Sequence, residues 1–373
     1  MKIICGKSDL SSSVNIVLRA VSSKTTLPIL ECIVIDVSKD HIRFISNDME
    51  LAIETIVKGK IIDPGTNKQI AINAKVFSEI IRKLSDNDVT IETDEHFVMT
   101  ITCEKAKFNI AGKPADEFPT LPHIERREAV ILSQFTLKEV IRQTVFSISD
   151  NESNKIMTGE LFEITGDTMR VVSLDGHRIS IRKIQLKENY GNLKVIVPGK
   201  TLTEISKILS GEIADEVTLY FTEKHILFEF DDTFVLSRLI EGEYYKINQM
   251  LSNDYETKLV INKKEFFNCI DRSTLLIKES EKKPIIVGVT DNVMELRINS
   301  HIGSMKEEID IHKEGKDILI GFNPKFLMDV LRVVDDEEVT IYMINPKAPC
   351  FIKDKEESYI YLILPVNFNA ANI

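Results

Sequence analysis

The sequence predicts an α+β protein with three similar domains, each built from two units in which a helix is followed by a β-hairpin. The clearest unit lies between Lys194 and Phe230. It begins with a short apolar strand, continues with a segment (200–209) whose apolar residues have helical spacing, and ends with two segments of alternating apolar residues. The same order of elements recurs in residues 70–101 and 318–352. A chain of 373 residues suits two or three domains, and the repeat favours three.

The helix of this unit keeps one register in all three copies. Basic residues stand at its start and seven positions later, at Lys75 and Arg82, Lys200 and Lys207, and Lys325 and Arg332. An acidic residue lies between them, at Glu79, Glu204 and Asp329. Because positions three, four and seven residues apart share one face of a helix, each copy should bury an apolar stripe and expose a basic–acidic–basic stripe. For one helix the simplest interpretation is a solvated face, whereas three copies in one register indicate a shared task or common descent.

The first half of each repeat predicts a second helix-plus-hairpin unit. We expect helices at 14–21, behind a capping region at 11–13, and at 137–148 and 264–276. We expect strands at 29–35, 42–45 and 51–53, at 157–164 and 169–173, and at 285–289 and 294–298. A helix with a hairpin cannot bury its apolar face alone, so two units should pack into each domain. The predicted domains are residues 1–124, 125–253 and 254–373.

The composition argues against several classes of protein. The formal net charge of −11 disfavours indiscriminate nucleic-acid binding but leaves room for a local basic surface. The five cysteines are scattered and none forms a C-x-x-C pair, which indicates reduced thiols and no structural zinc. The N-terminus has no signal-peptide pattern, and no apolar run approaches the roughly 20 residues of a membrane span. We therefore expect a cytoplasmic protein.

No segment predicts a catalytic site. Residues 198–201 read PGKT, like the end of a phosphate-binding loop, but that motif needs a glycine where Lys194 stands. The acidic run at residues 335–338 is typical of a solvated turn. Residues 175–178, DGHR, contain catalytic residue types but indicate a turn, with no nucleophile in a recognisable setting. We expect no catalytic residue, no metal and no cofactor.

Seven short motifs occur along the whole chain. They are TLPIL at 26–30, GKPADEFP at 112–119, DGHR at 175–178, VPGK at 197–200, SRLIEG at 237–242, GFN at 321–323 and YLILP at 361–365. Together with the threefold repeat, these motifs make the chain resemble the bacterial sliding clamp family, the beta subunits of DNA polymerase III. The resemblance implies a DNA-clamp fold, in which two head-to-tail chains form a ring with helices inside and sheets outside.

The resemblance also implies a function without catalysis. Members of the family encircle duplex DNA, slide without sequence specificity and tether the replicative polymerase for processive synthesis. The positions that would face DNA are Lys24, Lys75, Arg82, Asn154, Lys155, Lys200, Lys207, Lys325 and Arg332. The positions that would close the homodimer are Phe108 and Ile110 on one edge and Leu275 and Leu276 on the other.

In the family, the polymerase, the clamp loader and repair proteins insert a short peptide motif into a pocket between the second and third domains. Most of the matching positions are apolar, which suits apolar anchors. They are Met157, Leu174, Gly176, His177, Arg178, Ile179, Tyr245, Met250, Asn323, Phe326, Pro349, Leu362, Leu364 and Val366. This chain departs from the family in Leu174, which is larger than the usual residue, in Tyr245, which replaces a frequent proline, and in a tail, 369–373, beyond the usual end.

Two other functions stay open on the sequence alone. A protein-interaction scaffold with the same fold would not hold DNA, and the basic stripe favours a clamp over such a scaffold. A carboxylate-dependent nuclease would need a cluster of carboxylates and histidine, which the sequence does not predict. Retention on nicked circular DNA, compared with linear DNA, distinguishes a ring from a scaffold.

Overall fold

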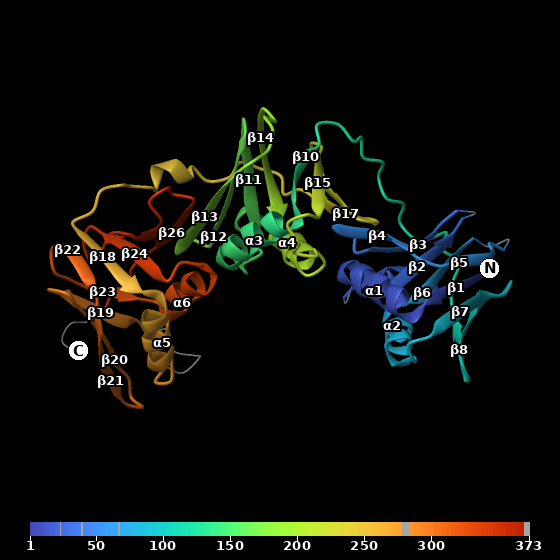
Figure 1. Cartoon of the computed structure of the whole chain (residues 1–373), viewed down its shortest axis with the longest axis horizontal. Helices are drawn as coiled ribbons and strands as arrows, with labels where there is room; N and C mark the ends of the chain where they lie inside the picture. The colour runs from blue at the N-terminus through green and yellow to red at the C-terminus, as the bar shows by residue number, and fades with distance from the viewer. Residues whose placement is uncertain (23, 39, 66–67, 278–282, 369–373) are drawn as a thin grey trace. The chain divides into compact units, whose positions relative to one another are not determined.

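The computed structural model describes residues 1–22, 24–38, 40–65, 68–277 and 283–368. Within these residues, one pattern of strand, helix and three-stranded antiparallel meander occurs six times (Figure 1). The first two copies are β1 (Lys2–Gly6), α1 (Lys7–Val17), β2 (Cys32–Val37), β3 (Ile42–Asn47), β4 (Leu51–Val57), and β6 (Gln69–Asn73), α2 (Ala74–Lys83), β7 (Asp88–Thr93), β8 (Val98–Cys103), β9 (Ala106–Ala111). The next two are β10 (Val130–Ser133), α3 (Gln134–Thr144), β11 (Gly159–Thr165), β12 (Thr168–Leu174), β13 (Arg178–Gln185), and β14 (Asn192–Pro198), α4 (Gly199–Ser206), β15 (Glu216–Phe221), β16 (His225–Phe230), β17 (Thr233–Arg238). The last two are β18 (Thr257–Asn262), α5 (Lys263–Thr274), β19 (Ile285–Thr290), β20 (Val293–Asn299), β21 (Ser304–Asp310), and β23 (Ile318–Phe322), α6 (Pro324–Val333), β24 (Glu338–Met343), β25 (Cys350–Lys353), β26 (Tyr359–Ile363).

Neighbouring copies exchange their first strands. In the first pair of copies, β1 pairs with β7 and β6 pairs with β2, so each first strand joins the meander of the other copy. The same exchange links β10 with β15 and β14 with β11, and then β18 with β24 and β23 with β19. Because each copy completes the sheet of its neighbour, one copy alone leaves strand edges unpaired.

The chain divides into two compact units that do not coincide with the three repeats. One unit contains residues 1–137 and 204–239, and the other contains residues 138–203 and 240–373. The first holds an eight-stranded sheet, β10-β15-β16-β17-β4-β3-β2-β6, and a five-stranded sheet, β5 (Lys60–Asp63)-β1-β7-β8-β9. Helices α1 and α2 contact each other, and Phe77 of α2 meets Phe44 of β3 edge to face, with ring centroids 6.0 Å apart.

The second unit is built in the same way. It holds a nine-stranded sheet, β14-β11-β12-β13-β26-β25-β24-β18-β22 (His312–Gly315), and a four-stranded sheet, β21-β20-β19-β23. Helices α5 and α6 pack against each other. Their buried side chains, among them Phe266, Ile270, Leu327 and Leu331, belong to one core with strands of both sheets. Within each unit, the helices therefore contribute one apolar face to a core shared with the sheets.

Asparagine caps explain where three of the helices begin. Asn73 and Asn262 are the last residues of their strands, and Asn323 directly follows one. Each side chain accepts a hydrogen bond from a backbone N–H in the first turn of α2, α5 and α6 respectively. Such a cap satisfies a donor that the helix itself leaves unpaired. The chain therefore passes from strand to helix without a loop.

Several predicted boundaries are wrong. Helix α1 begins at Lys7 rather than at residue 14, and Ser13 lies inside it, where its hydroxyl donates to the Asp9 carbonyl (2.9 Å) instead of capping. Residues Pro28–Glu31 and Lys155–Thr158 form 3₁₀ turns, so the predicted strands at 29 and 157 begin later, at Cys32 and Gly159. Each predicted hairpin is a three-stranded meander.

None of the helices in the described part of the chain has the length and apolarity needed to span a membrane.

Candidate functional site

A cavity of about 400 Å³ lies in the second compact unit, where β13 pairs with β26. Its lining consists of Met157, Leu174, Gly176, His177, Arg178, Ile179, Tyr245, Met250, Pro349, Leu362 and Leu364. All of these are among the positions predicted for the partner pocket. The structure thus gathers residues from distant segments around one cavity, which we call the partner pocket.

The pairing of β13 with β26 forms the apolar floor of the partner pocket. Ile179 lies opposite Leu362 in this antiparallel pair, and both are buried. Beyond the strand end, the backbone N–H of Leu364 donates to the carbonyl of His177 (2.8 Å). Met250 and Leu364 are exposed apolar residues of the lining. A buried apolar floor with exposed apolar residues around it is typical of a surface that binds a partner.

The turn before β13 is held by Asp175. Its Oδ1 accepts the backbone N–H groups of His177 (2.9 Å) and Arg178 (3.2 Å), and its Oδ2 accepts Arg178 Nε (2.9 Å). Gly176 has φ +88°, a conformation that residues with a side chain rarely adopt. The carboxylate therefore shapes the turn, in agreement with the structural interpretation of DGHR.

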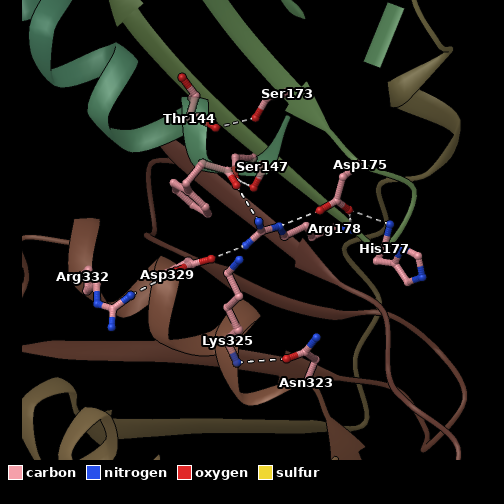
Figure 2. A network of polar contacts seen from close by, with 12 residues as sticks. Thr144, Ser147, Ser173, Asp175, His177, Arg178, Asn323, Lys325, Asp329 and Arg332 are labelled. Atoms are coloured by element: carbon pink, nitrogen blue, oxygen red, sulfur yellow. Dashed lines mark hydrogen bonds and ion pairs between the residues drawn. The ribbon is translucent and has the colours of Figure 1, made fainter. Parts of the chain in front are cut away.

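Arg178 connects this turn to α6 (Figure 2). Its Nη1 donates to Asp329 Oδ2 (2.7 Å), and its Nη2 donates to the carbonyl of Phe146 (2.5 Å). Its guanidinium also lies 4.5 Å from the ring centroid of Phe326. Only 7% of the Arg178 side chain is exposed, so its charge is buried but fully partnered. Arg178 is thus a rigid wall of the partner pocket.

Buried hydroxyls support the carbonyl that Arg178 binds. Phe146 lies in a 3₁₀ turn, Val145–Ser147, at the end of α3. Ser147 Oγ is 2.6 Å from Ser180 Oγ, and Ser173 Oγ donates to the carbonyl of Thr144 (2.6 Å). These buried hydrogen bonds fix the turn against β12 and β13 (Figure 2).

Three predicted pocket positions lie outside the lining. Asn323 caps α6, with its Oδ1 accepting Lys325 N–H (3.0 Å). Phe326 stacks on Arg178, and its ring centroid is 6.1 Å from that of His177. The N–H of Val366 donates to Gly321 O (2.8 Å) beside β23. The predicted tail, 369–373, lies outside the described residues.

The basic residues of the repeated stripe are exposed, but the acidic residues between them differ. Lys75 and Arg82 lie on α2, Lys200 lies on α4 and Lys207 directly after it, and Lys325 and Arg332 lie on α6. Glu79 is exposed as predicted, whereas Glu204, whose side chain is 19% exposed, and Asp329 depart from the prediction. Asp329 departs furthest. Only 12% of its side chain is exposed, because it binds both Arg178 and Arg332 (3.2 Å). The acid of α6 therefore belongs to the partner pocket as much as to the stripe.

The other predicted DNA-facing residues lie outside the α-helices and strands. Lys24 and Lys155 are exposed. Asn154 is half-buried and donates through Nδ2 to the hydroxyl of Tyr245 (2.7 Å), a residue of the pocket lining. This contact ties Asn154 to the partner pocket, a connection that the sequence did not indicate.

The predicted interface positions lie on an edge strand and at the end of a helix. Phe108 and Ile110 lie on β9, the last strand of its sheet. Leu275 is the C-cap of α5 and is 79% exposed, while Leu276 is half-buried against the core. Among the third strands of the six meanders, β4 pairs with β17 and β13 pairs with β26, whereas β9 and β21 have no partner strand on their outer side in the described residues.

The two carboxylates that hold Arg178 were not among the predicted site residues. Asp175 was visible in principle, because it precedes Arg178 by three residues in a predicted turn. Asp329 was not, because it is 151 positions away in the chain. All five cysteines are buried and unpaired, and within the described residues no cluster of three or more His, Cys, Asp or Glu residues is arranged to hold a metal.

Comparison with known proteins places the chain in a family. Residues 1–122, 131–246 and 248–367 match the N-terminal, central and C-terminal domains of the DNA polymerase III beta subunit. The beta sliding clamps of Staphylococcus aureus and Staphylococcus epidermidis are 35% and 34% identical over 363 residues, 95% of this chain and 96% of each relative. A putative DNA polymerase III beta subunit from Eubacterium rectale (64% identity, TM-score 0.95) and the DNA polymerase sliding clamp of Bacillus subtilis (34%, 0.93) have the same fold over 99% of this chain and 100% of theirs. The chain therefore belongs to the DNA polymerase III beta subunit family and has its three-domain clamp fold.

Proposed function

We propose that this chain is a non-catalytic processivity clamp: two copies form a closed ring that encircles duplex DNA and tethers the replicative polymerase. Its domains would be residues 1–124, 125–253 and 254–373. Its place of action would be the cytoplasm, where the chromosome is copied. Membership in the sliding clamp family supports this function.

The observation that carries the ring is the pairing of meander edges. The third strand of one meander pairs antiparallel with the third strand of another, in β4–β17 and in β13–β26. Only β9 and β21 are left without such a partner in the described part of the chain. If β9 of one copy pairs with β21 of another, two head-to-tail copies use all four free edges, and the assembly closes. Phe108, Ile110, Leu275 and Leu276 would then be covered by the partner copy.

The stripes would hold DNA through its phosphates. Exposed lysine and arginine neutralise phosphates without reading sequence, so binding should be non-specific and sensitive to salt. The acid in each stripe reduces the local positive charge. A weak grip of this kind suits sliding better than tight binding.

The partner pocket would take a short peptide motif of the polymerase, of the clamp loader and of repair proteins. Its apolar floor suits aliphatic or aromatic anchors. Met157 and Met250 have flexible side chains, which lets one pocket adapt to several peptides.

The mass in solution and retention on DNA test this function together. We expect sedimentation to give twice the chain mass of 42.5 kDa, and loaded protein to stay on nicked circular DNA but to leave the same DNA once it is linearised. Replacing Leu275 and Leu276 by Glu should give folded monomers that are not retained, because unpaired charges would enter the interface. Ile213→Glu, at another exposed apolar residue, should leave the dimer intact. Equal retention on circular and linear DNA would refute the ring.

Reversing the stripe tests where DNA lies. Lys75→Glu, Lys200→Glu and Lys325→Glu together should weaken retention for all sequences alike and reduce its dependence on salt, since three phosphate contacts are lost. Unchanged retention would show that the stripes face away from DNA.

A further inference from the structure

The first compact unit contains a second cavity, of about 390 Å³, where β4 pairs with β17. Its lining is Asn47, Met49, Glu50, Ala52, Pro119, Thr120, Leu121, Pro122, His225, Leu236 and Arg238. We call it the second cradle. The motif SRLIEG at 237–242 contributes Arg238, a side chain for which the proposed function has no use.

The second cradle occupies the place in its unit that the partner pocket occupies in the other. Four residues of its lining precede four residues of the partner pocket by 127 positions. They are Asn47, Met49, Glu50 and Ala52, which correspond in this order to Leu174, Gly176, His177 and Ile179. Leu236 and Arg238 likewise precede Leu362 and Leu364 by 126 positions. Ala52 lies opposite Leu236 in the β4–β17 pair, as Ile179 lies opposite Leu362.

The backbone of the two sites also matches. Asp48 Oδ1 accepts the N–H groups of Glu50 (3.0 Å) and Leu51 (2.8 Å), as Asp175 does in the partner pocket. Arg238 N–H donates to Glu50 O (2.9 Å), which repeats the hydrogen bond of the partner pocket beyond the strand end. Met49 has φ +78° although it carries a side chain. Backbone outliers of this kind concentrate at functional sites, because the surrounding structure must hold them in place.

The side chains of the two sites differ in character. The lining of the partner pocket is mostly apolar, whereas the second cradle combines apolar and charged side chains. The floor stays apolar, with Ala52, Leu121 and Leu236 in one cluster of apolar residues. Arg238 stands where the partner pocket has Leu364, and His225 lies beside it in the lining. Arg238 is exposed, and among the described residues no carboxylate is within ion-pairing distance of it. An unpaired guanidinium above an apolar floor is complementary to an apolar side chain followed by an anion.

Glu50 narrows the choice of anion. It lines the same cradle, next to Arg238 across the strand pair. Glu50 offsets part of the positive charge of Arg238, so the cradle gains little from the second charge of a phosphate, whereas that charge costs more to desolvate. The cradle therefore suits a ligand with one carboxylate.

We propose that the second cradle is a separate docking site for an extended peptide that places an apolar side chain on Ala52, Leu121 and Leu236 and a carboxylate on Arg238. This proposal rests on the proposed function in one respect, because it assumes that the matching partner pocket binds peptides. A clamp with both sites could hold two different partners on one chain. Peptides with only apolar anchors would choose the partner pocket, and acidic ones the second cradle.

Selection from a peptide library tests the proposal. A phage library of random heptapeptides is selected on the full chain carrying Leu364→Asp, which damages the partner pocket alone. We expect enriched peptides with an apolar residue followed by Asp or Glu. A selected peptide, synthesised and measured by fluorescence anisotropy, should bind roughly ten- to a hundredfold more weakly to Arg238→Ala. Lys224→Ala, which removes a nearby exposed cation outside the lining, should leave its affinity unchanged.

Three outcomes would overturn the second cradle. They are the failure to enrich any peptide, enrichment of peptides that lack an acid, and affinities that Arg238→Ala does not change. A polymerase-derived peptide on the unaltered chain is the separate control. If it fails to bind, the partner pocket is refuted, whatever happens at Arg238. If it binds and the selected peptide fails, only the second cradle is refuted.

Discussion

The junction of β13 with β26 and the junction of β4 with β17 have one backbone design but bury different groups. In both, a serine of the middle meander strand donates to the last turn of the preceding helical segment. Ser173 donates to Thr144 O in one, and Ser46 donates to Val17 O in the other. The two donors are 127 residues apart in the sequence, and so are the two acceptors.

Two ionisable residues mark the difference. Arg178 is buried at the β13–β26 junction, and Glu160 is buried on β11 of the same sheet. The equivalent residues of the other unit, 127 positions earlier, are Leu51 and Ile33, which are also buried. Burying an apolar side chain at such a position costs less free energy, because it carries no charge that loses its hydration. Arg178 lines the partner pocket, which indicates that this costly group keeps the shape of the pocket rather than the stability of the unit.

The acid at the same position of the repeated helix shows the difference again. Asp329 binds the buried Arg178. Glu204, its counterpart, binds Lys207 (2.7 Å) and Arg19 (3.5 Å), side chains that are 43% and 38% exposed. One acid therefore positions a pocket wall, whereas the other, itself only 19% exposed, pairs with cations that reach solvent.

The largest expected effect comes from Glu160. Burial raises its pKa to about 8. Thr144 Oγ1 lies 2.7 Å from Val140 O and 2.9 Å from Glu160 Oε2, and a hydroxyl has one proton, so both hydrogen bonds form only if the carboxyl of Glu160 is protonated. A folded pKa above the unfolded value gives stability that is present below the unfolded pKa, near 4.5, and is lost as pH rises through 8.

We therefore expect the free energy of unfolding to fall by about 1.4 kcal/mol per pH unit, or about 4 kcal/mol between pH 5 and 8, relative to Glu160→Gln. Urea unfolding of both proteins at several pH values measures the difference. Glu223→Gln, at an exposed carboxylate, should follow the unaltered chain. Parallel pH profiles for Glu160→Gln and the unaltered chain would show that Glu160 is ionised in the fold.

The second prediction concerns Asp329, the acid that holds Arg178. Asp329→Ala leaves a buried guanidinium with only Asp175 and one carbonyl as partners, so the free energy of unfolding should fall by about 3 kcal/mol. The affinity for a polymerase-derived peptide should fall as well, because the pocket wall loses its support. Arg178→Leu with Asp329→Leu should recover most of the stability but not the affinity. If the double variant binds the peptide normally, the ionic wall has no role in the pocket.

The third prediction concerns the segment after β26, which supplies Leu364 to the partner pocket. Ending the chain after Ile363 removes Leu364 from the pocket lining, so a polymerase-derived peptide should bind at least tenfold more weakly, a loss of about 1.4 kcal/mol or more. A cut after Phe368 keeps that residue and should preserve binding. Dimerisation and DNA retention should survive both cuts. Unchanged peptide affinity after the shorter cut would refute the pocket assignment.

The sequence predicted the repeated units well, because alternation and helical spacing are local signals. The third strand β9 escaped, since its residues, AKFNIA, are nearly all exposed and show no buried–exposed alternation. Helix α1 was placed too late, because its first turn, with Lys7, Ser8 and Asp9, is polar. The pocket residues came from the resemblance alone. The Arg178–Asp329 pair depends on how β13 and α6 pack, which no local pattern contains.

The smallest expected effect is at Glu204, the counterpart of Asp329. Its side chain is 19% exposed, but its partners are flexible cations in contact with solvent, so the ion pairs are screened and hold little energy. We expect Glu204→Ala to lower the free energy of unfolding by less than about 1 kcal/mol. Loss of the acid from the stripe should also strengthen DNA retention slightly at low salt, because Lys207 then meets phosphate without competition. Urea unfolding and retention at two salt concentrations measure both effects. A loss of stability as large as that of Asp329→Ala would mean that the two junctions use their helix acids in the same way.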